Sequence, residues 1–482
     1  MAKDSTVLKP ILVTASIAIG LASSFFVRYV GINLLTPDNY GQIAVSLSIF
    51  SVGSMLSMIG LQKAITSIVA QSEMGISEVL RDSLYISVVS SAVFLTISVP
   101  AIYFEFQNRE TLTVIILFCF SIPFANIIRI ITSILQGQNK TITASFIENI
   151  LFLSGGYLVL VILFVFRLSV TDAALAWMIY VSIASVLICT FYSNQKLEVR
   201  EYLPSLDNSK RILALSVPLM ISDAAWELMI NSDNIILGIL LGSRLTGIYD
   251  GMFTITRVLL VFITAAGFVF LPRYASVYSD GNDPSPLYVK YSRGLFIVSL
   301  PIFIILVTNS IEIIDLLYPQ AYNYGNESLI ILSVGIFSHT VFGLNGYALI
   351  AEQKTRVIAL GNIFGAFLNI TLNLLFIPTL GIIGAAFAST AGYLATNIIF
   401  SAYIFKRVDI TVYLRSLFVP AVLGCIAITT TKIIKITANI DGYFSLFNNI
   451  LIFAIIYSLL ILRFGISESE LAKLSYYVKN RF

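Results

Sequence analysis

The stretch DNIILGILLGSRLTGIYDGMFTITR, at residues 233–257, decides the fold that we predict. It contains the end of one apolar helix, a short glycine-containing turn and the start of a second apolar helix. A weaker copy, VRYVGINLLTPDNYGQIAVSLSIF, occupies residues 27–50. Gly41 of this copy falls opposite Gly247, so we infer that one helix–turn–helix unit occurs twice in the chain.

The composition places the chain in a membrane. Of its 482 residues, 57% are hydrophobic and only 11% are charged, whereas soluble domains contain about 25% charged residues. Apolar runs of about 20 residues, long enough to cross the hydrocarbon core, recur along the chain. We therefore predict an all-α polytopic membrane protein with about fourteen transmembrane helices. The net charge of +3 is small and scattered and gives no indication of a nucleic-acid partner.

The basic residues between the predicted helices indicate the orientation. Most of them fall on the side of the N-terminus, which predicts that both termini lie in the cytoplasm. The longest basic loop, near residues 193–210, is the natural boundary between two halves. We predict a six-helix lobe over residues 1–205, a second six-helix lobe over 206–408, and two additional transmembrane helices with a cytoplasmic tail over 409–482.

A second pair of similar segments supports the repeat. QGQNKT at 136–141 resembles AEQKT at 351–355, and each is followed by a segment rich in small residues, at 172–176 and 384–388. The two pseudo-symmetric lobes then share one orientation, so the axis that relates them lies along the membrane normal. Two lobes that can rock against each other are typical of a transporter.

Three arginines lie inside predicted transmembrane helices: Arg28 in the first, Arg129 in the fourth and Arg257 in the eighth, which we predict over 247–271. An arginine at mid-membrane costs about 2.5–3.5 kcal/mol, so each needs a compensating environment. Arg28 and Arg129 lie within two turns of a helix end, where snorkelling to the interface is an equal alternative. Arg257 is expected to face a watery or anionic cavity.

Acidic residues also occur inside the predicted helices: Asp223, Glu227 and Asp233 in the seventh, Glu148 in the fifth and Asp250 at the start of the eighth. At 100° per residue, four polar side chains share one helix face: Asp223, Glu227, Asn231 and Asn234. Two interpretations remain open for these acids. They form a structural ion-pair network with the arginines, or they make a site that takes up a proton or a cation.

Residues with catalytic or metal-binding chemistry are sparse. The only histidine, His339, has no acid or cysteine at ligand spacing, so we expect it to be packed and hydrogen-bonded, with no metal site. Cys119, Cys189 and Cys425 lie in apolar runs and are expected to be buried thiols. The sequence contains no P-loop, nucleophile-elbow or zinc-protease motif, so we expect no enzyme activity and no cofactor.

Several segments resemble a known family. The stretch SDNIILGILLGSRLTGIYDGMFTITR (232–257) resembles the span seven to eight signature of polysaccharide-transport proteins in the multidrug/oligosaccharidyl-lipid/polysaccharide exporter superfamily. Similar family character is present in LLTPDNYGQIAVSLSI (34–49) and LLYPQAYNYGNESLIILSV (316–334). The most specific segment is IAEQKTRVIALGNIFGAFLNITLNLLFIPTLGIIGAAFASTAGYL (350–394).

The resemblance implies a flippase for polyprenyl-diphosphate-linked oligosaccharides, with two six-helix lobes around a central cavity that opens alternately to each side. Cations line the cavity in this family, which makes Arg28, Arg129 and Arg257 the candidate substrate-binding residues, because a diphosphate suits the forked donors of arginine. The candidates for proton or sodium coupling, or for charge pairing, are the five acids: Asp223, Glu227, Asp233, Asp250 and Glu148. We expect a multi-pass protein of the plasma (inner) membrane that functions as a monomer. Its expected partners are a lipid-linked oligosaccharide, membrane lipids and glycan-assembly proteins.

Two alternatives remain. Drug and cation antiporters of the same superfamily share the two-lobe plan, but they usually place acids rather than arginines in the cavity. A membrane glycan polymerase or ligase is also polytopic, but such enzymes generally need a large outward loop. The longest outward loop that we predict here is under about twenty residues, an ordinary connection length.

Overall fold

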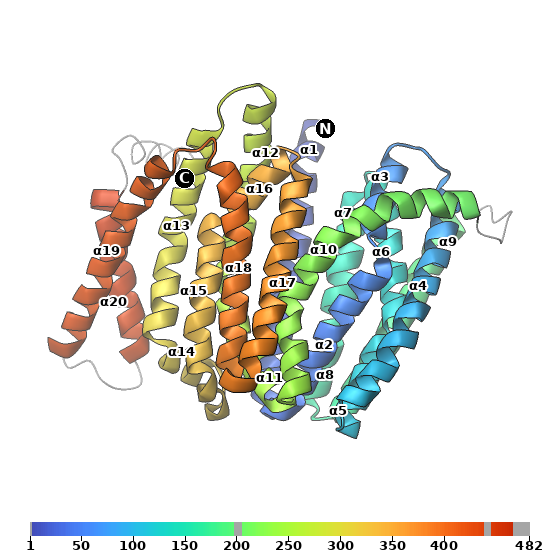
Figure 1. Cartoon of the computed structure of the whole chain (residues 1–482), viewed down its shortest axis with the longest axis horizontal. Coiled ribbons are helices and arrows are strands. Elements are labelled where there is room, and N and C mark those ends of the chain that lie inside the picture. The colour runs from blue at the N-terminus through green and yellow to red at the C-terminus, as the bar shows by residue number, and fades with distance from the viewer. Residues whose placement is uncertain (1, 197–204, 438–444, 466–482) are drawn as a thin grey trace. The chain divides into compact units, whose positions relative to one another are not determined.

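The computed structural model describes residues 2–196, 205–437 and 445–465. These residues form helices and connecting turns, with no β-strand in the described ranges. Within these ranges, fourteen helical segments are long and apolar enough to cross a membrane, which confirms the predicted number. The predicted all-α class of a polytopic membrane protein is also confirmed. Figure 1 shows the course of the chain and the helix labels.

The contacts divide the chain into two compact units. Unit 1 comprises Met1–Thr254 and Ala366–Ala388, and unit 2 comprises Ile255–Gly365 and Ser389–Phe482. This division follows packing rather than the sequence repeat. The lobe boundaries at residues 205 and 408 therefore stay a prediction.

The helices that lie in unit 1 are α1 (Ala2–Leu34), α2 (Pro37–Met58), α3 (Leu61–Ala70), α4 (Ile76–Glu105), α5 (Arg109–Phe120), α6 (Ile122–Gly137), α7 (Thr141–Ser145), the π-helix η1 (Phe146–Ser154), α8 (Gly155–Val165), α9 (Val170–Lys196), α10 (Leu206–Leu240) and most of α11 (Ser243–Thr256). Part of α17 (Thr355–Leu380) and the start of α18 (Ile382–Ile404) also belong to this unit.

The remaining elements lie in unit 2: α12 (Val258–Ser279), α13 (Ser285–Thr308), α14 (Ser310–Leu317), the 3-10 helix η2 (Gln320–Gly325), α15 (Asn326–Phe342), α16 (Leu344–Ala351), α19 (Ile410–Thr437), α20 (Ser445–Leu460) and the π-helix η3 (Ile461–Gly465). The two additional helices, α19 and α20, pack against α13 and against each other.

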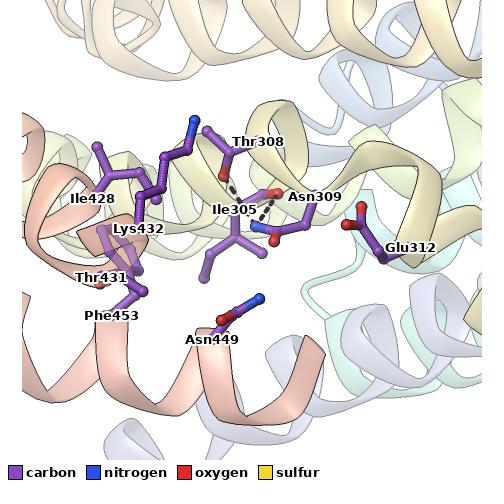
Figure 2. A pocket seen from close by; sticks show the side chains of 9 residues that line it. All are labelled: Ile305, Thr308, Asn309, Glu312, Ile428, Thr431, Lys432, Asn449 and Phe453. Atoms are coloured by element: carbon purple, nitrogen blue, oxygen red, sulfur yellow. Dashed lines mark hydrogen bonds between the residues drawn. The ribbon is translucent and has the colours of Figure 1, made fainter. Parts of the chain in front are cut away.

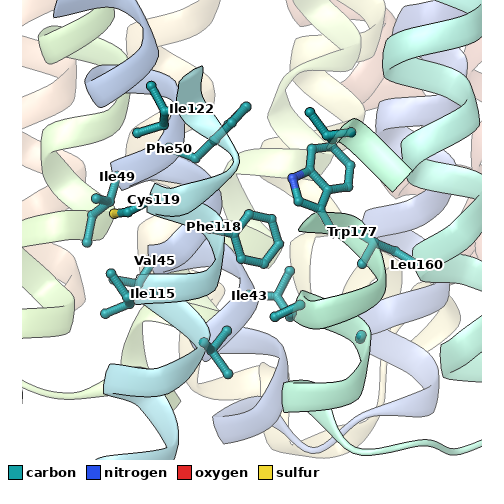
Figure 3. Close-up of a cluster of buried hydrophobic side chains, with 14 of the residues drawn as sticks. Ile43, Val45, Ile49, Phe50, Ile115, Phe118, Cys119, Ile122, Leu160 and Trp177 are labelled. Carbon is teal, nitrogen blue, oxygen red and sulfur yellow. The ribbon is translucent and has the colours of Figure 1, made fainter. Parts of the chain in front are cut away.

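An aromatic cluster forms the core of unit 1 between α2, α5, α8 and α9 (Figure 3). The ring of Phe118 stacks on the indole of Trp177 at 5.5 Å between centroids, and Phe50 meets the same indole edge-on at 5.9 Å. Offset stacking and edge-to-face contacts are the favoured aromatic geometries. Because lipid is as apolar as these side chains, close packing rather than the hydrophobic effect holds such helices together.

Helix ends show the repeat in the backbone. Asn139 and Gln353 both adopt a left-handed conformation, as do Arg167 and Gly381, and the two pairs have the same spacing in sequence. The bond that closes the helix end is also repeated. The Lys140 amide donates to the carbonyl of residue 135, and the Lys354 amide donates to that of residue 349, each at 2.9 Å. These are Schellman-type ends, and they occur in the QGQNKT and AEQKT segments.

Two predicted spans contain helix breaks. The fourth is divided at Ser121, and Pro123 follows near the start of α6, as expected of a proline at that position. The bounds that we predicted for the eighth span, 247–271, were wrong. Helix α11 ends at Thr256, Arg257 lies in a turn, and the apolar span begins only at Val258. Hydropathy is continuous across this break, so a sequence pattern gives no signal of it.

Candidate functional site

The α10–α11 hairpin is closed by two polar contacts. Gly242, with φ of +84°, makes the turn between the helices. The Tyr249 hydroxyl donates to Asp233 at 2.6 Å, and the Asn234 amide donates to Asp250 at 3.1 Å. The two pairs connect adjacent residues of α10 with adjacent residues of α11. The acids that the sequence placed in the membrane therefore lie where the two helices of the hairpin meet.

Asp250 forms a buried ion pair with Arg28. The carboxylate of Asp250 is fully buried, and the Arg28 side chain is only 14% exposed. The hydroxyl of Tyr40 and the amide of Asn234 also donate to this carboxylate, and the same Asn234 amide donates to Ser48 on α2 at 3.1 Å. The Arg28 side chain is therefore compensated by an ion pair rather than by snorkelling to the membrane interface. It joins α1 to α11 through a carboxylate whose lone pairs accept several hydrogen bonds.

Asp233 is the centre of a second buried network, which joins α10 to α17. Its carboxylate accepts hydrogen bonds from Asn373 at 2.6 Å and from Asn369 at 3.0 Å, both on α17. The Ser232 hydroxyl donates to the Asn369 side-chain oxygen at 2.7 Å. The asparagine side chains of α17 thus connect two helices, which is the common role of carboxamides inside membranes.

Helices α2 and α11 cross at the two glycines that the repeat pairs, Gly41 and Gly247. A Cβ atom added to Gly41 would lie 1.7 Å from the Ser243 carbonyl oxygen, and one added to Gly247 would lie 2.2 Å from the Pro37 carbonyl oxygen. Pro37 and Ser243 are also equivalent in the repeat, so the contact is symmetric. Only glycine allows backbones to approach this closely. The crossing brings α2 and α11 into backbone contact at the membrane face where α2 begins.

An open pocket of about 450 Å³ lies at the opposite end of α2, beside α3, α6 and η1. Its polar lining includes Gln62, Lys63, Gln136 and Glu148. The Lys63 ammonium lies 2.6 Å from a carboxylate oxygen of Asp223, and 58% of the Lys63 side chain is exposed. Lys63 is therefore a cation that a ligand in this pocket can reach.

Arg129 lies close to this pocket. Its guanidinium donates to the Ser54 hydroxyl on α2 at 2.6 Å, and Ser54 in turn donates to the buried Asn126. Glu148 lies on the π-helix η1, close enough to Arg129 for electrostatic attraction. A π-helix widens the helical turn and is often found at functional sites.

The remaining predicted site residues are Glu227 and Arg257. The Glu227 carboxylate accepts a hydrogen bond from Asn231 one turn later on α10, at 2.9 Å. Arg257 is partly buried in the turn between α11 and α12 and belongs to unit 2. The two ends of the predicted polar face of α10 contact neighbouring helices: Asp223 contacts α3, and Asn234 contacts α2.

Several polar residues at these sites were missed by the sequence analysis. Lys63 was treated only as one of the basic residues between spans, although it lies in the first turn of the short amphipathic helix α3, which begins after Gly60. Tyr40 and Tyr249 were not singled out, because a tyrosine in an apolar run carries no sequence signal of its partner. In unit 2, Glu352 accepts hydrogen bonds from Tyr274 at 2.8 Å and from Arg407 at 3.0 Å. Glu352 belongs to the repeated AEQKT segment, and this repeat was the one sequence feature that could have pointed to it.

The histidine and cysteine predictions have mixed outcomes. His339 is packed as predicted, with Nδ1 3.1 Å from the Asn397 amide and its ring 5.1 Å from that of Tyr393. All three cysteines are free, but only Cys119 is buried. Cys189 is partly exposed and Cys425 is exposed, because an apolar run in a membrane protein also covers the lipid-facing surface. Within the described ranges, no group of three or more histidine, cysteine or acidic side chains is placed to hold a metal ion.

Comparisons with known proteins agree with this architecture. Two structures show the fold: a lipid II flippase MurJ in an inward closed conformation, and an inward-facing multidrug resistance MATE family transporter of the MOP superfamily. The first has a TM-score of 0.75 at 15% identity and covers 93% of this chain and 98% of its own. The second has a TM-score of 0.65 at 16% identity and covers 82% of this chain and 98% of its own.

Sequence comparisons indicate the family. A protein of Haloferax volcanii described as "Probable low-salt glycan biosynthesis flippase Agl15" is 22% identical over 284 residues, which span 58% of each chain. Residues 245–455 match the family described as Lipid II flippase MurJ. Residues 9–278, more than half of the chain, match the family described as Polysaccharide biosynthesis protein. The chain therefore belongs to the polysaccharide biosynthesis protein family.

Proposed function

We propose that the chain is a flippase that moves a polyprenyl-diphosphate-linked oligosaccharide from the cytoplasmic to the outer leaflet by alternating access, for surface polysaccharide or glycan biosynthesis. Its family, the glycan flippase relative and the MurJ-like fold support this assignment. The transport itself involves no chemical transformation, so we propose no catalytic residue and no enzyme activity.

One observation carries the proposal: in unit 1 the α2 and α11 backbones are in contact at one membrane face, which we interpret as the closed face, and a pocket opens at the other. The glycine crossing of α2 and α11 is at the start of the second span, and the Lys63 pocket lies beyond its end. This arrangement is what an alternating-access transporter needs in one of its two states. With both termini in the cytoplasm, the closed face is the outer one and the pocket faces the cytoplasm.

The chemistry of the pocket suits a glycan joined to a diphosphate. Lys63 is exposed enough to contact a phosphate, and hydroxyls and carboxamides around it can bind sugar hydroxyls. The diphosphate carries more negative charge than the single carboxylate of Asp223, so it can replace Asp223 as the partner of Lys63. We propose Lys63 as the first cation that the substrate meets.

We keep Arg28, Arg129 and Arg257 as the cations that the diphosphate meets later in transport. In the closed arrangement Arg28 is occupied by Asp250, so it becomes available only after α2 and α11 separate. Arg129 lies beside the pocket and pairs electrostatically with Glu148.

Ion coupling is a further proposal. Among the acids, Glu148 is the strongest candidate for proton or sodium uptake because it lines the open pocket, whereas Asp233 and Asp250 are enclosed in hydrogen-bond networks. Asp223 already pairs with Lys63 on α3, and Glu227 already accepts a hydrogen bond from Asn231 on α10. We therefore assign charge pairing to these four acids and coupling to Glu148.

The cellular setting follows from the proposed substrate. We place the chain in the plasma membrane as a monomer, in contact with membrane lipids and with the glycan-assembly proteins that supply and consume the lipid-linked glycan. A drug or cation antiporter is the second candidate function. It is favoured by the likeness to a MATE transporter and by the buried acids Asp233 and Asp250.

Deletion of the gene distinguishes the two candidates. We expect the deletion to retain the lipid-linked glycan on the cytoplasmic leaflet, where impermeant reagents added outside cannot modify it. Expression of the wild-type chain should restore its exposure. Normal exposure of the glycan in the deletion strain, combined with increased sensitivity to cationic drugs, would instead support the antiporter.

A further inference from the structure

Unit 2 contains a polar pocket that the proposed transport function does not use. It lies between α13 and α14 on one side and α19 and α20 on the other (Figure 2). In Figure 2, Lys432 and Glu312 flank the pocket on two sides, with Asn309 and Asn449 between them. Phe453 of α20, which is almost fully buried, also lines it.

The pocket lies at a membrane face. Thr308 is the last residue of the ninth span, Lys432 is two residues from the end of the thirteenth, and Asn449 is in the first turn of the fourteenth. All three ends are on the side opposite the N-terminus, since odd-numbered spans begin on the N-terminal side. With both termini in the cytoplasm, as in the proposed function on which this step rests, the pocket is at the level of lipid headgroups in the outer leaflet.

One side chain of the pocket has an unmet hydrogen-bonding requirement. Asn449 is 7% exposed, and its side-chain oxygen has no hydrogen-bond partner among the described residues. A buried acceptor without a partner costs free energy, so it indicates a site for a donor group. By contrast, the Asn309 amide is satisfied by Thr308 at 2.9 Å and by the carbonyl of residue 305 at 3.3 Å.

The dimensions of the pocket select a small ligand group. Its volume is about 80 Å³, which is room for on the order of six water-sized groups. A lipid headgroup with a phosphate and a short amine fits this space better than a hexose does. Exposed apolar side chains on the neighbouring turns, Ile311, Ile433, Phe447 and Leu451, offer a surface for acyl chains.

We propose that this pocket binds the headgroup of a membrane phospholipid that carries a primary ammonium group beside a phosphodiester. The phosphodiester contacts the Lys432 ammonium, and the lipid ammonium lies between the Glu312 carboxylate and the Asn449 side-chain oxygen. Each charge of the headgroup then meets its opposite, and the unpartnered oxygen of Asn449 receives a donor. The bound lipid joins α13 and α14 to the two additional helices, α19 and α20.

Other lipids match the pocket less well. A quaternary ammonium headgroup has no N–H to donate to Asn449. An anionic headgroup without an amine brings its charge close to Glu312 and also leaves Asn449 without a donor. Phosphatidylethanolamine, phosphatidylcholine and phosphatidylglycerol with identical acyl chains are therefore the probes that separate these chemistries.

Native mass spectrometry of the full chain in detergent measures the binding of each lipid. We expect phosphatidylethanolamine to bind about tenfold more tightly than phosphatidylcholine, the ratio that corresponds to one charged hydrogen bond. The same preference is expected in Thr429→Val, a control on an exposed turn of α19. In Asn449→Leu the preference should be lost. Lys432→Gln should instead weaken the binding of phosphatidylethanolamine and phosphatidylcholine alike, because both carry the phosphodiester that contacts Lys432.

Glu312→Gln provides a second test in case the Asn449 variant fails to fold. Glu312 is exposed, so its substitution leaves the core intact. We expect this variant to bind phosphatidylglycerol more tightly than the wild type does, by about tenfold. Equal binding of all three lipids by the wild type would overturn the proposal. So would equally tight binding of water-soluble phosphoethanolamine, since that result assigns the pocket to a free metabolite rather than to a membrane lipid.

Discussion

The crossing of α2 and α11 predicts that Gly41→Ala opens the outer face. The added Cβ would lie 1.7 Å from the Ser243 carbonyl oxygen, whereas a carbon–oxygen contact needs about 3.3 Å. The new Cβ would meet a backbone carbonyl, so no side chain can rotate away to relieve the overlap. The helices must therefore separate by the difference, about 1.6 Å.

The energetic effect follows from this overlap. Overpacking of a close contact costs about 1–3 kcal/mol, and here it is applied only to the closed state. The ratio of closed to open molecules should fall by about 5- to 150-fold. Gly247→Ala should have a similar effect, because its Cβ would lie 2.2 Å from the Pro37 carbonyl oxygen at the equivalent place in the repeat.

Thiol labelling measures the opening. Ser46 is buried on α2 beyond the crossing, and its hydroxyl bonds only within its own helix, at 2.7 Å to the carbonyl of residue 42. In a chain with its native cysteines replaced by alanine, Ser46→Cys should react slowly with an impermeant maleimide added outside. Gly41→Ala should accelerate this labelling.

Gly294→Ala is the matched control, because a Cβ at this position of α13 meets no atom within 4 Å. It should leave the labelling of Cys at position 46 unchanged. If Gly41→Ala also leaves labelling unchanged, or if Gly294→Ala accelerates it equally, then the crossing does not close the outer face and the reasoning is refuted.

Three further predictions concern charged residues. Arg28→Met and Asp250→Asn should each lower the stability of the chain in detergent by about 3–5 kcal/mol, because each leaves a buried charge or donor without its partner. The double variant should recover part of this loss. Additive losses in the double variant would contradict the pairing. Lys63→Gln should reduce glycan translocation with little change in stability, since exposed ion pairs contribute about 0–1 kcal/mol, whereas Lys140→Gln on the same membrane face should preserve transport. Glu148→Gln should remove any response of transport to a proton or sodium gradient; a gradient response equal to that of the wild type would exclude Glu148 as the coupling residue.

The membrane fold could be predicted from the sequence because each span is an apolar run bounded by polar or helix-terminating residues. The repeat was also readable, since Gly41 and Gly247 and the AEQKT-like segments recur. The structure explains why these segments are similar: Gly41 and Gly247 touch each other, and Gln353 and Asn139 end helices in the same left-handed conformation.

The charge pairing could be predicted only in general terms. The sequence placed arginines and acids inside helices and left a structural network as one of two interpretations. It could not pair Arg28 with Asp250, because these residues are far apart in sequence and the partner depends on how α1 packs against α11. The role of Lys63 was missed for a related reason, since a lysine beside a span normally reports only orientation.

The helix break at Arg257 could not be predicted from the hydropathy pattern. No proline or glycine adjoins the break to indicate that α11 ends at Thr256. The exposed Cys425 has a similar origin. In a membrane protein, apolar residues face both the protein interior and the lipid, so hydrophobicity alone does not predict burial.

Transport by the purified chain in proteoliposomes tests the central claim most directly. A polyprenyl-diphosphate-linked oligosaccharide is placed in both leaflets, and its accessibility to an impermeant glycosidase outside is followed over time. We expect vesicles with the wild-type chain to expose the inner-leaflet pool, and vesicles with Lys63→Gln to do so more slowly. Exposure no faster than in vesicles without protein, in a preparation that transports cationic drugs, would contradict the flippase assignment.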